Sequence, residues 1–344
     1  MKKILNYACV FAAVLSMASC QKNEVLTEDD YVTATFTIEA PAELSTKAII
    51  GDGTTAKNLV FAVYPYDSRL TDDQNGLAEE LTDLRKGDWT ANGLGDKQPV
   101  TFTTGADGRP TATVKVTLLR GKEYQFVCWA QCKDVTCYDF ADMKNIKVDY
   151  TGAVSQDETR DAFYAWTPTK DDQGNVIKVS QGFKQTIILR RPFAQVNVGA
   201  TDMEAAKSAG LDITKIQSKM TVYNVATTLN TFTGATSGST QAEFSIKQAV
   251  SPTEDLTINA SGYENQSFGW LAMNYVLPSE SNTNIVFVLY DENSEELCSH
   301  EVTNEKLHQN FRTHLLGEVL TTEGTITVVI EPAFLNDDKV VAIQ

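Results

Sequence analysis

Residues 31–38 read Tyr31-Val32-Thr33-Ala34-Thr35-Phe36-Thr37-Ile38, an alternation of apolar and polar side chains with a period of two. This period predicts a β-strand with one buried face, formed by Val32, Ala34, Phe36 and Ile38. Similar alternating or apolar runs recur at residues 59–64, 111–118, 124–130, 183–189, 193–198, 220–225, 270–276, 285–290, 297–302 and 325–330. Because turns rich in Gly, Asn, Asp and Ser separate these short runs, we expect an all-β protein built of β-sandwiches.

Local patterns add detail to this expectation. Residues 59–64 show no polar alternation, so we expect a strand that is buried on both faces. A turn at residues 120–122 separates two expected strands and predicts a β-hairpin. Two short helices are expected, over residues 77–86 and 202–209, each followed by a glycine. The 344 residues are enough for two sandwiches, with a junction near residues 184–192.

The N-terminus has the features of a lipoprotein signal. Lys2 and Lys3 precede an apolar stretch that is too short to span a bilayer, and Ala18-Ser19 stand directly before Cys20. Small residues at that place suit the signal peptidase, and the Cys20 thiol would take the lipid, with acyl chains such as palmitate. Several acyl chains on one residue anchor a protein firmly. The alternative is an ordinary signal peptide cut near Ala18, with Cys20 a chance thiol.

Composition limits the classes of partner. The formal net charge is −16, and removal of the signal peptide leaves 27 basic against 45 acidic side chains, a net charge of −18. Such a surface repels phosphate backbones, so we expect no nucleic-acid partner. No later segment is apolar for long enough to span a membrane, and we therefore expect a soluble body held at the membrane by lipid.

Four cysteines remain after Cys9 is removed and Cys20 is lipidated, too few for a disulfide scaffold. Cys128 alternates with Phe126 and Ala130, which predicts a small buried side chain. Cys132 and Cys137 flank a short loop and are a candidate disulfide in an oxidising compartment. Because no histidine lies near them, we expect no metal site there.

Enzyme signatures are missing. The sequence has no Gly-x-Ser-x-Gly motif, phosphate-binding loop or dinucleotide fingerprint. Its three histidines, His300, His308 and His314, are expected at the surface or on edge strands rather than in a metal site. Paired carboxylates of the glycosidase type remain open, since their spacing is three-dimensional. We therefore predict a protein that is not an enzyme and that needs no cofactor.

Several stretches together resemble the fimbrillin family, the subunits of type V pili and their relatives on Gram-negative anaerobes. The resemblance begins with the lipoprotein signal and the alternating strand, and it continues in the order of the motifs that follow. These motifs are Ser45-Thr46-Lys47-Ala48, Leu59-Val60-Phe61-Ala62-Val63-Tyr64, Arg191-Pro192-Phe193-Ala194-Gln195-Val196-Asn197-Val198 and Asn310-Phe311-Arg312-Thr313-His314-Leu315-Leu316-Gly317-Glu318-Val319-Leu320. Trp129-Ala130-Gln131 and Asp161-Ala162-Phe163-Tyr164 are similar to a fimbrillin-related lipoprotein subgroup.

The resemblance implies two tandem transthyretin-like β-sandwich domains, residues 48–185 and 186–344, after a signal peptide (1–19) and a lipidated segment (20–47). Family pilins are cut by an Arg- or Lys-specific protease after their first strand, which places the candidate bond at Lys47–Ala48. The cut would release the strand over residues 31–38. Its loss would open an apolar groove, which an extended segment of another subunit could fill. The resemblance thus implies a structural or adhesive fimbrial subunit that assembles with other fimbrial subunits.

Other roles remain open. Anchor subunits of the family keep their lipid, tip subunits lack a donor segment, and residues 336–344 are short for a donor strand. Lys47 is also explained as an ordinary loop lysine. The alternative from a different class is a monomeric lipid-anchored surface module that binds a glycan or a host protein. In each case we expect the cell outer membrane, lipid-anchored and surface-exposed, or the fimbria if the protein is processed.

Overall fold

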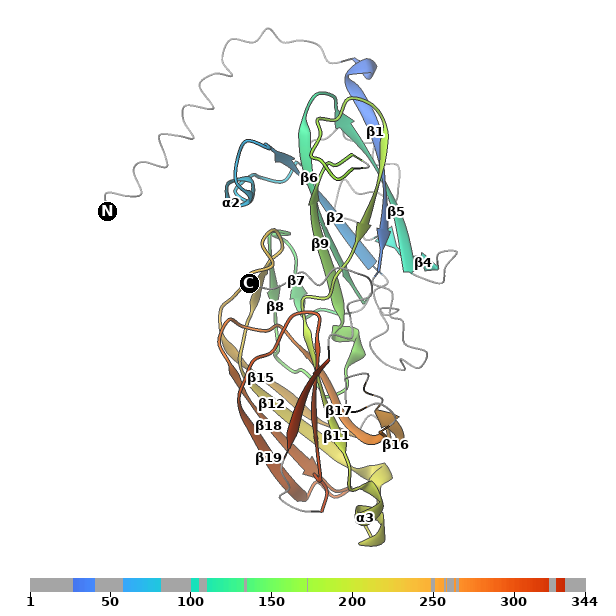
Figure 1. The fold of residues 1–344 in the computed structure, drawn as a ribbon, viewed down its shortest axis with the longest axis vertical. Helices are drawn as coiled ribbons and strands as arrows, with labels where there is room; N and C mark the ends of the chain where they lie inside the picture. Colours follow the sequence, from blue (N-terminus) through green and yellow to red (C-terminus); the bar gives the residue numbers. More distant parts are fainter. Residues whose placement is uncertain are drawn as a thin grey trace, which may run out of the picture.

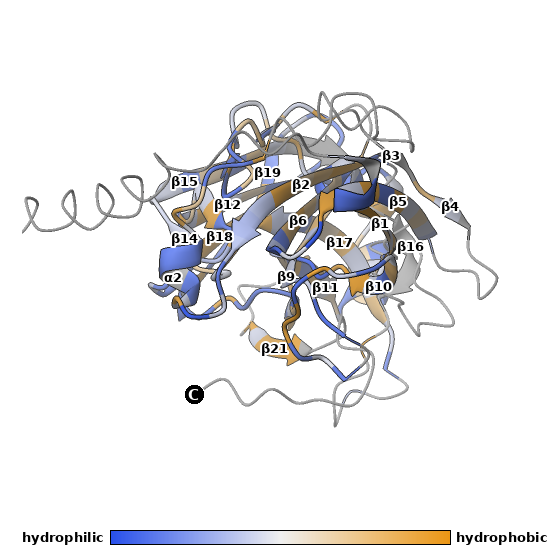
Figure 2. Cartoon of the chain, turned by 90° about the horizontal axis from the view of Figure 1, so that it is seen from above, coloured by the Kyte–Doolittle hydropathy of each residue, from blue (hydrophilic) through white to orange (hydrophobic). Residues whose placement is uncertain are grey.

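The computed structural model describes residues 27–40, 58–81, 100–104, 110–132, 135–171, 173–248, 251–256, 258, 263, 266–321 and 326–331. The strands form two β-sandwiches that follow each other along the long axis of the molecule (Figure 1). Seen along that axis, the cartoon coloured by hydropathy has many hydrophobic residues in the strands and many hydrophilic residues in the connecting segments (Figure 2). The expected all-β sandwich architecture with a few short helices is confirmed.

Two four-stranded sheets make the first sandwich. One has the order β10-β1-β5-β4, and the other has the order β3-β2-β6-β9. Their bounds are β1 (Tyr31–Glu39), β2 (Asn58–Tyr66), β3 (Val100–Thr101), β4 (Thr103–Thr104), β5 (Pro110–Leu119), β6 (Glu123–Gln131), β9 (Ala162–Pro168) and β10 (Phe183–Ile188). β10 contains residues 185 and 186, between which the sequence placed the domain boundary.

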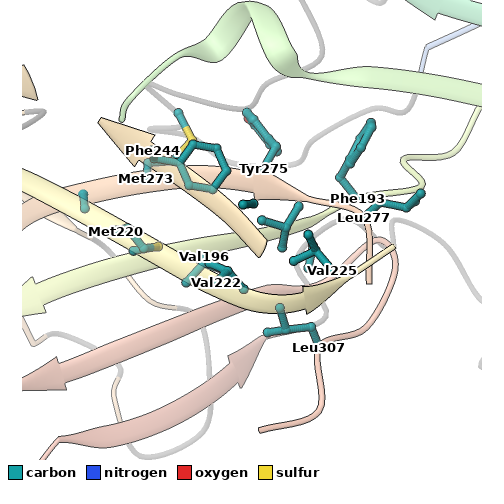
Figure 3. Close-up of a cluster of buried hydrophobic side chains, with 14 of the residues drawn as sticks. Phe193, Val196, Met220, Val222, Val225, Phe244, Met273, Tyr275, Leu277 and Leu307 are labelled. Atoms are coloured by element: carbon teal, nitrogen blue, oxygen red, sulfur yellow. The ribbon is translucent and has the colours of Figure 1, made fainter. Parts of the chain in front are cut away.

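A five-stranded and a four-stranded sheet make the second sandwich, with the orders β16-β17-β11-β20-β21 and β15-β12-β18-β19. Their bounds are β11 (Ala194–Ala200), β12 (Gln217–Val225), β15 (Thr240–Gln248), β16 (Ser251–Leu256), β17 (Phe268–Val276), β18 (Thr283–Tyr290), β19 (Glu296–Glu305), β20 (Arg312–Gly317) and β21 (Thr327–Glu331). Side chains such as Val196, Val222 and Phe244 gather in its core (Figure 3).

A third, small sheet joins segments that are distant in sequence. It has the order β14-β13-β8-β7, with β7 (Tyr138–Asp139), β8 (Asn145–Val148), β13 (Thr228–Asn230) and β14 (Thr236–Ser237). β7 and β8 lie in the connection between β6 and β9 of the first sandwich, whereas β13 and β14 follow β12 of the second. The two sandwiches are therefore linked by strand pairing as well as by the chain.

The two sandwiches repeat one topology. In the first, β1 runs antiparallel to β5 and parallel to β10. In the second, β11 runs antiparallel to β17 and parallel to β20. β1 and β11 thus occupy equivalent positions, each as the strand that joins an antiparallel pair to a parallel pair.

The sheet of β2, β6 and β9 is covered on both sides. Leu59, Phe61 and Val63 belong to the core of the first sandwich. Val60 and Tyr64 belong to a second hydrophobic cluster that continues through the small sheet into the second sandwich. The expectation that residues 59–64 are buried on both faces is confirmed, because this sheet is the middle of three layers.

Two local expectations are wrong. The turn after β5 does not form a hairpin, since β5 and β6 belong to different sheets. Gly121, with φ of +79°, allows the sharp turn that takes the chain from one sheet to the other. Residues 77–81 are not helical; the helix there is α2 (Asp72–Asn75), where Thr71 and Gln74 form a capping box. Residues 82–86 lie outside the described residues.

The second expected helix is confirmed as α3 (Met203–Ser208). Short 3₁₀ turns occur at Glu28–Asp30, Glu158–Arg160 and Ile213–Lys215. Within the described residues, no helix is long and apolar enough to cross a membrane.

Candidate functional site

The candidate displaced strand, β1, lies inside its sheet and not at the edge. Its nine residues pair antiparallel with β5, from Tyr31 opposite Leu119 to Glu39 opposite Thr111. On the other side it pairs parallel with β10, from Ala34 opposite Phe183 to Glu39 opposite Ile188. Without β1, the facing edges of β5 and β10 would have no partner between them.

One face of β1 is fully packed. The side chains of Ala34, Phe36 and Ile38 have no exposed surface, and Val32 is 7% exposed. These four residues are the alternating set expected from the sequence, and all belong to the core of the first sandwich. The threonines and Glu39 on the other face are exposed or half-buried. The pattern of one buried and one solvated face follows from the period of two.

Phe36 is the largest buried side chain of β1 and stands at the centre of an aromatic group. Its ring centroid lies 4.4 Å from that of Phe126 on β6, 5.3 Å from Phe61 on β2 and 5.7 Å from Phe183 on β10. The Phe183 ring meets it edge-on, at 89°. Phe36 therefore connects both sheets of the sandwich and the neighbouring strand of its own sheet.

Hydrogen bonds join both ends of β1 to neighbouring segments. Before the strand, the Thr27 amide and hydroxyl donate to the Asp30 carboxylate, which lowers the pKa of Asp30. The Arg120 amide donates to the Asp30 carbonyl (2.7 Å), and its guanidinium Nε donates to the Asp29 carbonyl (3.1 Å). After the strand, the Ala40 amide donates to the Pro110 carbonyl (3.0 Å). The contacts at the N-terminal end involve exposed side chains, so the two ladders and the apolar face provide most of what holds β1.

Burial of the three larger side chains of β1 contributes about 1.5–3 kcal/mol each. A groove lined by the partners of these side chains and by two unpaired strand edges is a site for strand addition. The arrangement thus holds one extended segment between two strands by backbone pairing and apolar packing.

The other predicted site residues are scattered. Cys20, Lys47 and Ala48 lie outside the described residues. Cys132 and Cys137 are both free and half-buried, and no disulfide joins them. Cys128 is fully buried, as expected, and burial raises its pKa. No group of three or more His, Cys, Asp or Glu side chains that could hold a metal ion occurs in the described part of the chain.

The histidines only partly match the expected surface or edge position. His300 lies on the edge strand β19 but is buried, with its Nε2 atom 3.3 Å from the Val319 carbonyl. His314 is fully buried within β20, an inner strand, so a surface position is wrong for this residue. His308 is half-buried against Phe311, and burial lowers its pKa.

The sequence reasoning missed two buried acidic groups. Asp161 forms a bidentate ion pair with Arg191, whose Nε donates to Oδ1 (2.6 Å) and whose Nη2 donates to Oδ2 (2.7 Å). Both side chains are almost completely buried. Both residues occur in motifs quoted for the family resemblance, but the motifs alone gave no sign that they pair. Asp202 accepts hydrogen bonds from the amides of Val319, Leu320 and Thr321. Its side chain therefore holds a distant loop and does not cap α3.

A separate polar cavity of about 390 Å³ lies beside the second sandwich. It is lined by residues 148–153, from the end of β8 onward, by Thr227 before β13, and by residues of β15. Asp149 and Glu243 provide carboxylates, and Thr151, Thr240 and Ser245 provide hydroxyl groups. Side chains of this kind can form hydrogen bonds with a polyol.

Structures with similar architecture have been solved for other proteins. One described as a "putative cell adhesion protein" from Bacteroides ovatus is 13% identical with a TM-score of 0.47, and the match covers 89% of this chain and 99% of that one. Another of that description, from Bacteroides uniformis, is 11% identical with a TM-score of 0.46 and coverage of 86% and 98%. The fimbrial anchor protein Mfa2 from Porphyromonas gingivalis is 12% identical with a TM-score of 0.38 and coverage of 83% and 90%.

No protein with a curated function matches the sequence. The chain belongs to DUF6562, a family of unknown function whose model matches residues 27–344.

Proposed function

We propose that this member of DUF6562 is a structural or adhesive fimbrial subunit that joins other subunits by strand addition. The observation that carries the proposal is the position of β1. It is an inner strand with a packed apolar face. Its covalent connection to the other described strands runs only through residues 41–57. One cut in that segment would separate β1 from the rest of the chain.

In this proposal the protein is exported as a lipoprotein with its lipid on Cys20. The small residues Ala18-Ser19 before this cysteine, and the polar residues after it, support lipidation. The outer membrane would then hold the protein until a protease cuts the Lys47–Ala48 bond. A subunit that keeps its lipid would remain at the membrane as the base of an assembly. The role is non-catalytic, since the site works by pairing and packing.

Limited proteolysis tests the proposal. A recombinant form without Cys20, residues 21–344, is treated with trypsin at low dose and then followed by mass spectrometry and by SDS gel electrophoresis without heating. We expect loss of the piece that ends at Lys47, followed by SDS-resistant ladders. The matched control is the double variant Lys47→Gln/Lys57→Gln, which keeps polar side chains but removes both tryptic sites between β1 and β2, and should give neither product.

Two results would contradict strand addition. In one, the cut occurs and the piece leaves, but the protein stays monomeric at high concentration. In the other, the Lys47→Gln/Lys57→Gln variant forms the same ladders, which would show that assembly does not depend on loss of β1.

The cavity beside β15 favours a second candidate, a lipid-anchored surface module that binds a glycan. Carboxylates and hydroxyls line this cavity, and such groups can fix the orientation of a polar ligand, although Asp149 also accepts from the Thr151 amide and Glu243 is paired with Lys219. A glycan array with the uncut chain and an Asp149→Asn variant would test it. Binding that the variant loses would support this role, and absence of binding to every glycan would exclude it for the glycans tested.

A further inference from the structure

The inward positions of β1 differ in the size of side chain that they accept. Ala34 lies in register between Val116 and Phe183, and its methyl group is completely buried. A larger residue there would press on the Phe183 ring, which also packs against Phe36. Because protein interiors are close-packed, this position requires a small side chain.

The next inward positions require larger side chains. Phe36 is surrounded by three rings and has no exposed surface, so a smaller side chain would leave a cavity between them. Ile38 lies in register between the small Ala112 and the larger Ile187, and it is also fully buried. Val32 has a partner on β5 but none on β10, and it is the most exposed of the four. It is therefore the least restricted position.

The two neighbouring strands also define a direction. In the direction of β1, an incoming segment runs antiparallel to β5 and parallel to β10, and its small residue meets Phe183 before its aliphatic residue meets Ile187. A segment in the reverse direction would place the aliphatic residue against Phe183 and leave space beside Ala112. The slot thus favours a small, an aromatic and a branched aliphatic residue at alternate positions, and it accepts them in this order only when the segment runs in the direction of β1.

The chain itself offers no free segment with this order. Ala-x-Phe occurs twice in the sequence, in β1 and at Ala242-Glu243-Phe244 in β15, where Ile246 follows as Ile38 does in β1. Ala242 and Phe244 are fully buried in the second sandwich, and Phe244 packs against Tyr150. The residues after β21, 332–344, contain no Ala-x-Phe.

We propose that the slot left by β1 selects an extended segment of a different protein, with a small, an aromatic and a β-branched aliphatic residue at successive inward positions, inserted in the direction of β1. A second copy could supply this segment only by giving up its own β1 or by unfolding β15 of its second sandwich. This inference rests on the proposed function. It adds which residue types the inserted strand carries and that the strand comes from a different protein.

A peptide competition experiment tests the inference. The mature chain is cut at Lys47, and the binding of a fluorescent peptide with the sequence of residues 31–39 is measured by polarisation after mild urea treatment releases the original strand. Unlabelled peptides then compete for the slot. They are the native sequence, its Phe36→Ala, Ala34→Leu and Thr35→Ala variants, the same residues in reverse order, and residues 332–344.

We expect the Phe36→Ala peptide to compete at least a hundredfold less well than the native peptide. The Ala34→Leu and reversed peptides should each lose about tenfold or more. The Thr35→Ala peptide, changed on the solvated face, should compete like the native peptide, and residues 332–344 should not compete.

Equal competition by all peptides would overturn the selection but leave strand addition intact. Strong competition by residues 332–344 would overturn the assignment to a different protein, since a second copy could then supply the strand. Failure of the native peptide itself to bind would contradict the proposed function. The outcomes therefore distinguish an error in this inference from an error in the proposal on which it rests.

Discussion

Replacement of Phe36 by alanine tests whether β1 is a fully packed part of the first sandwich. The ring is completely buried and lies 4.4, 5.3 and 5.7 Å from the rings of Phe126, Phe61 and Phe183. Truncation of a buried Phe loses its transfer free energy and leaves a cavity, at a cost of about 3–5 kcal/mol. Each aromatic pair that is lost is worth roughly 0.5–1.5 kcal/mol beyond burial. We therefore expect the upper part of the range, a loss of about 4–5 kcal/mol in the free energy of unfolding of the first sandwich.

The assay is equilibrium urea unfolding of the uncut mature chain, combined with hydrogen exchange that reports each sandwich separately. Exchange should accelerate for the amides of β1, β5 and β10, and much less for β18 and β19 in the second sandwich. Thr35→Ala is the matched control. It changes the same strand between the same two ladders, opposite Lys115 and Lys184, but on the half-buried outer face. Its expected cost is below about 1 kcal/mol.

Similar losses of stability for the two variants would refute the reasoning. They would mean that the inward face of β1 contributes no more than its outer face. The groove that loss of β1 leaves would then have little apolar character with which to bind another strand.

Three further predictions concern other parts of the molecule. Arg191→Met leaves the buried Asp161 without its ion-pair partner and should lower the free energy of unfolding by about 3–5 kcal/mol. The double variant Arg191→Met/Asp161→Leu should regain much of that loss, and a double variant as unstable as the single one would contradict this. Asp202→Ala removes the acceptor of three amide hydrogen bonds and should lower the free energy of unfolding by about 1–3 kcal/mol, with faster amide hydrogen exchange at Val319, Leu320 and Thr321. Unchanged exchange would show that the carboxylate does not hold the loop. Burial raises the pKa of Cys298 to about 11, so its thiol stays protonated at pH 8, and its rate of labelling with iodoacetamide should rise about tenfold per pH unit below that value. A rate that levels off near pH 8.5, with Cys298→Ser to identify the labelled peptide, would contradict the shift.

Local patterns predicted the strands well because burial of one face imposes a period of two. The alternation at residues 31–38 identified the strand and all four of its inward side chains. The unbroken apolar run at 59–64 identified a strand covered on both faces. Helix prediction failed over residues 77–81, the described part of the expected helix, where Leu77 is 65% exposed and follows α2 without being part of it. The signal that was available is the capping box of Thr71 and Gln74, which places the helix start earlier.

The partners of each strand were not predictable from local sequence. The turn at Gly121 has residues typical of a β-hairpin turn. Whether the chain then returns to the same sheet depends on how the two sheets pack. The parallel partner of β1 is β10, more than 140 residues further along the chain. The pairing of Asp161 with Arg191 likewise depends on the junction between the sandwiches. The sequence therefore identified the strand at the candidate site, and only the structure identified the slot around it.

The repeated topology supports the proposal that β1, and not β11, is the strand that leaves. Both strands occupy the same place in their sandwiches, but every residue of β11 is buried. The chain also continues on both sides of β11, from β10 before it and into α3 after it. A single cut in residues 41–57 separates β1 from every other described strand, while β11 would need two cuts. Loss of β1 also uncovers only one face of the sheet of β2, β6 and β9, because the cluster that continues into the second sandwich still covers the other. The second sandwich would thus keep the base of the open groove in place, which is the condition for refilling it with a strand from another protein.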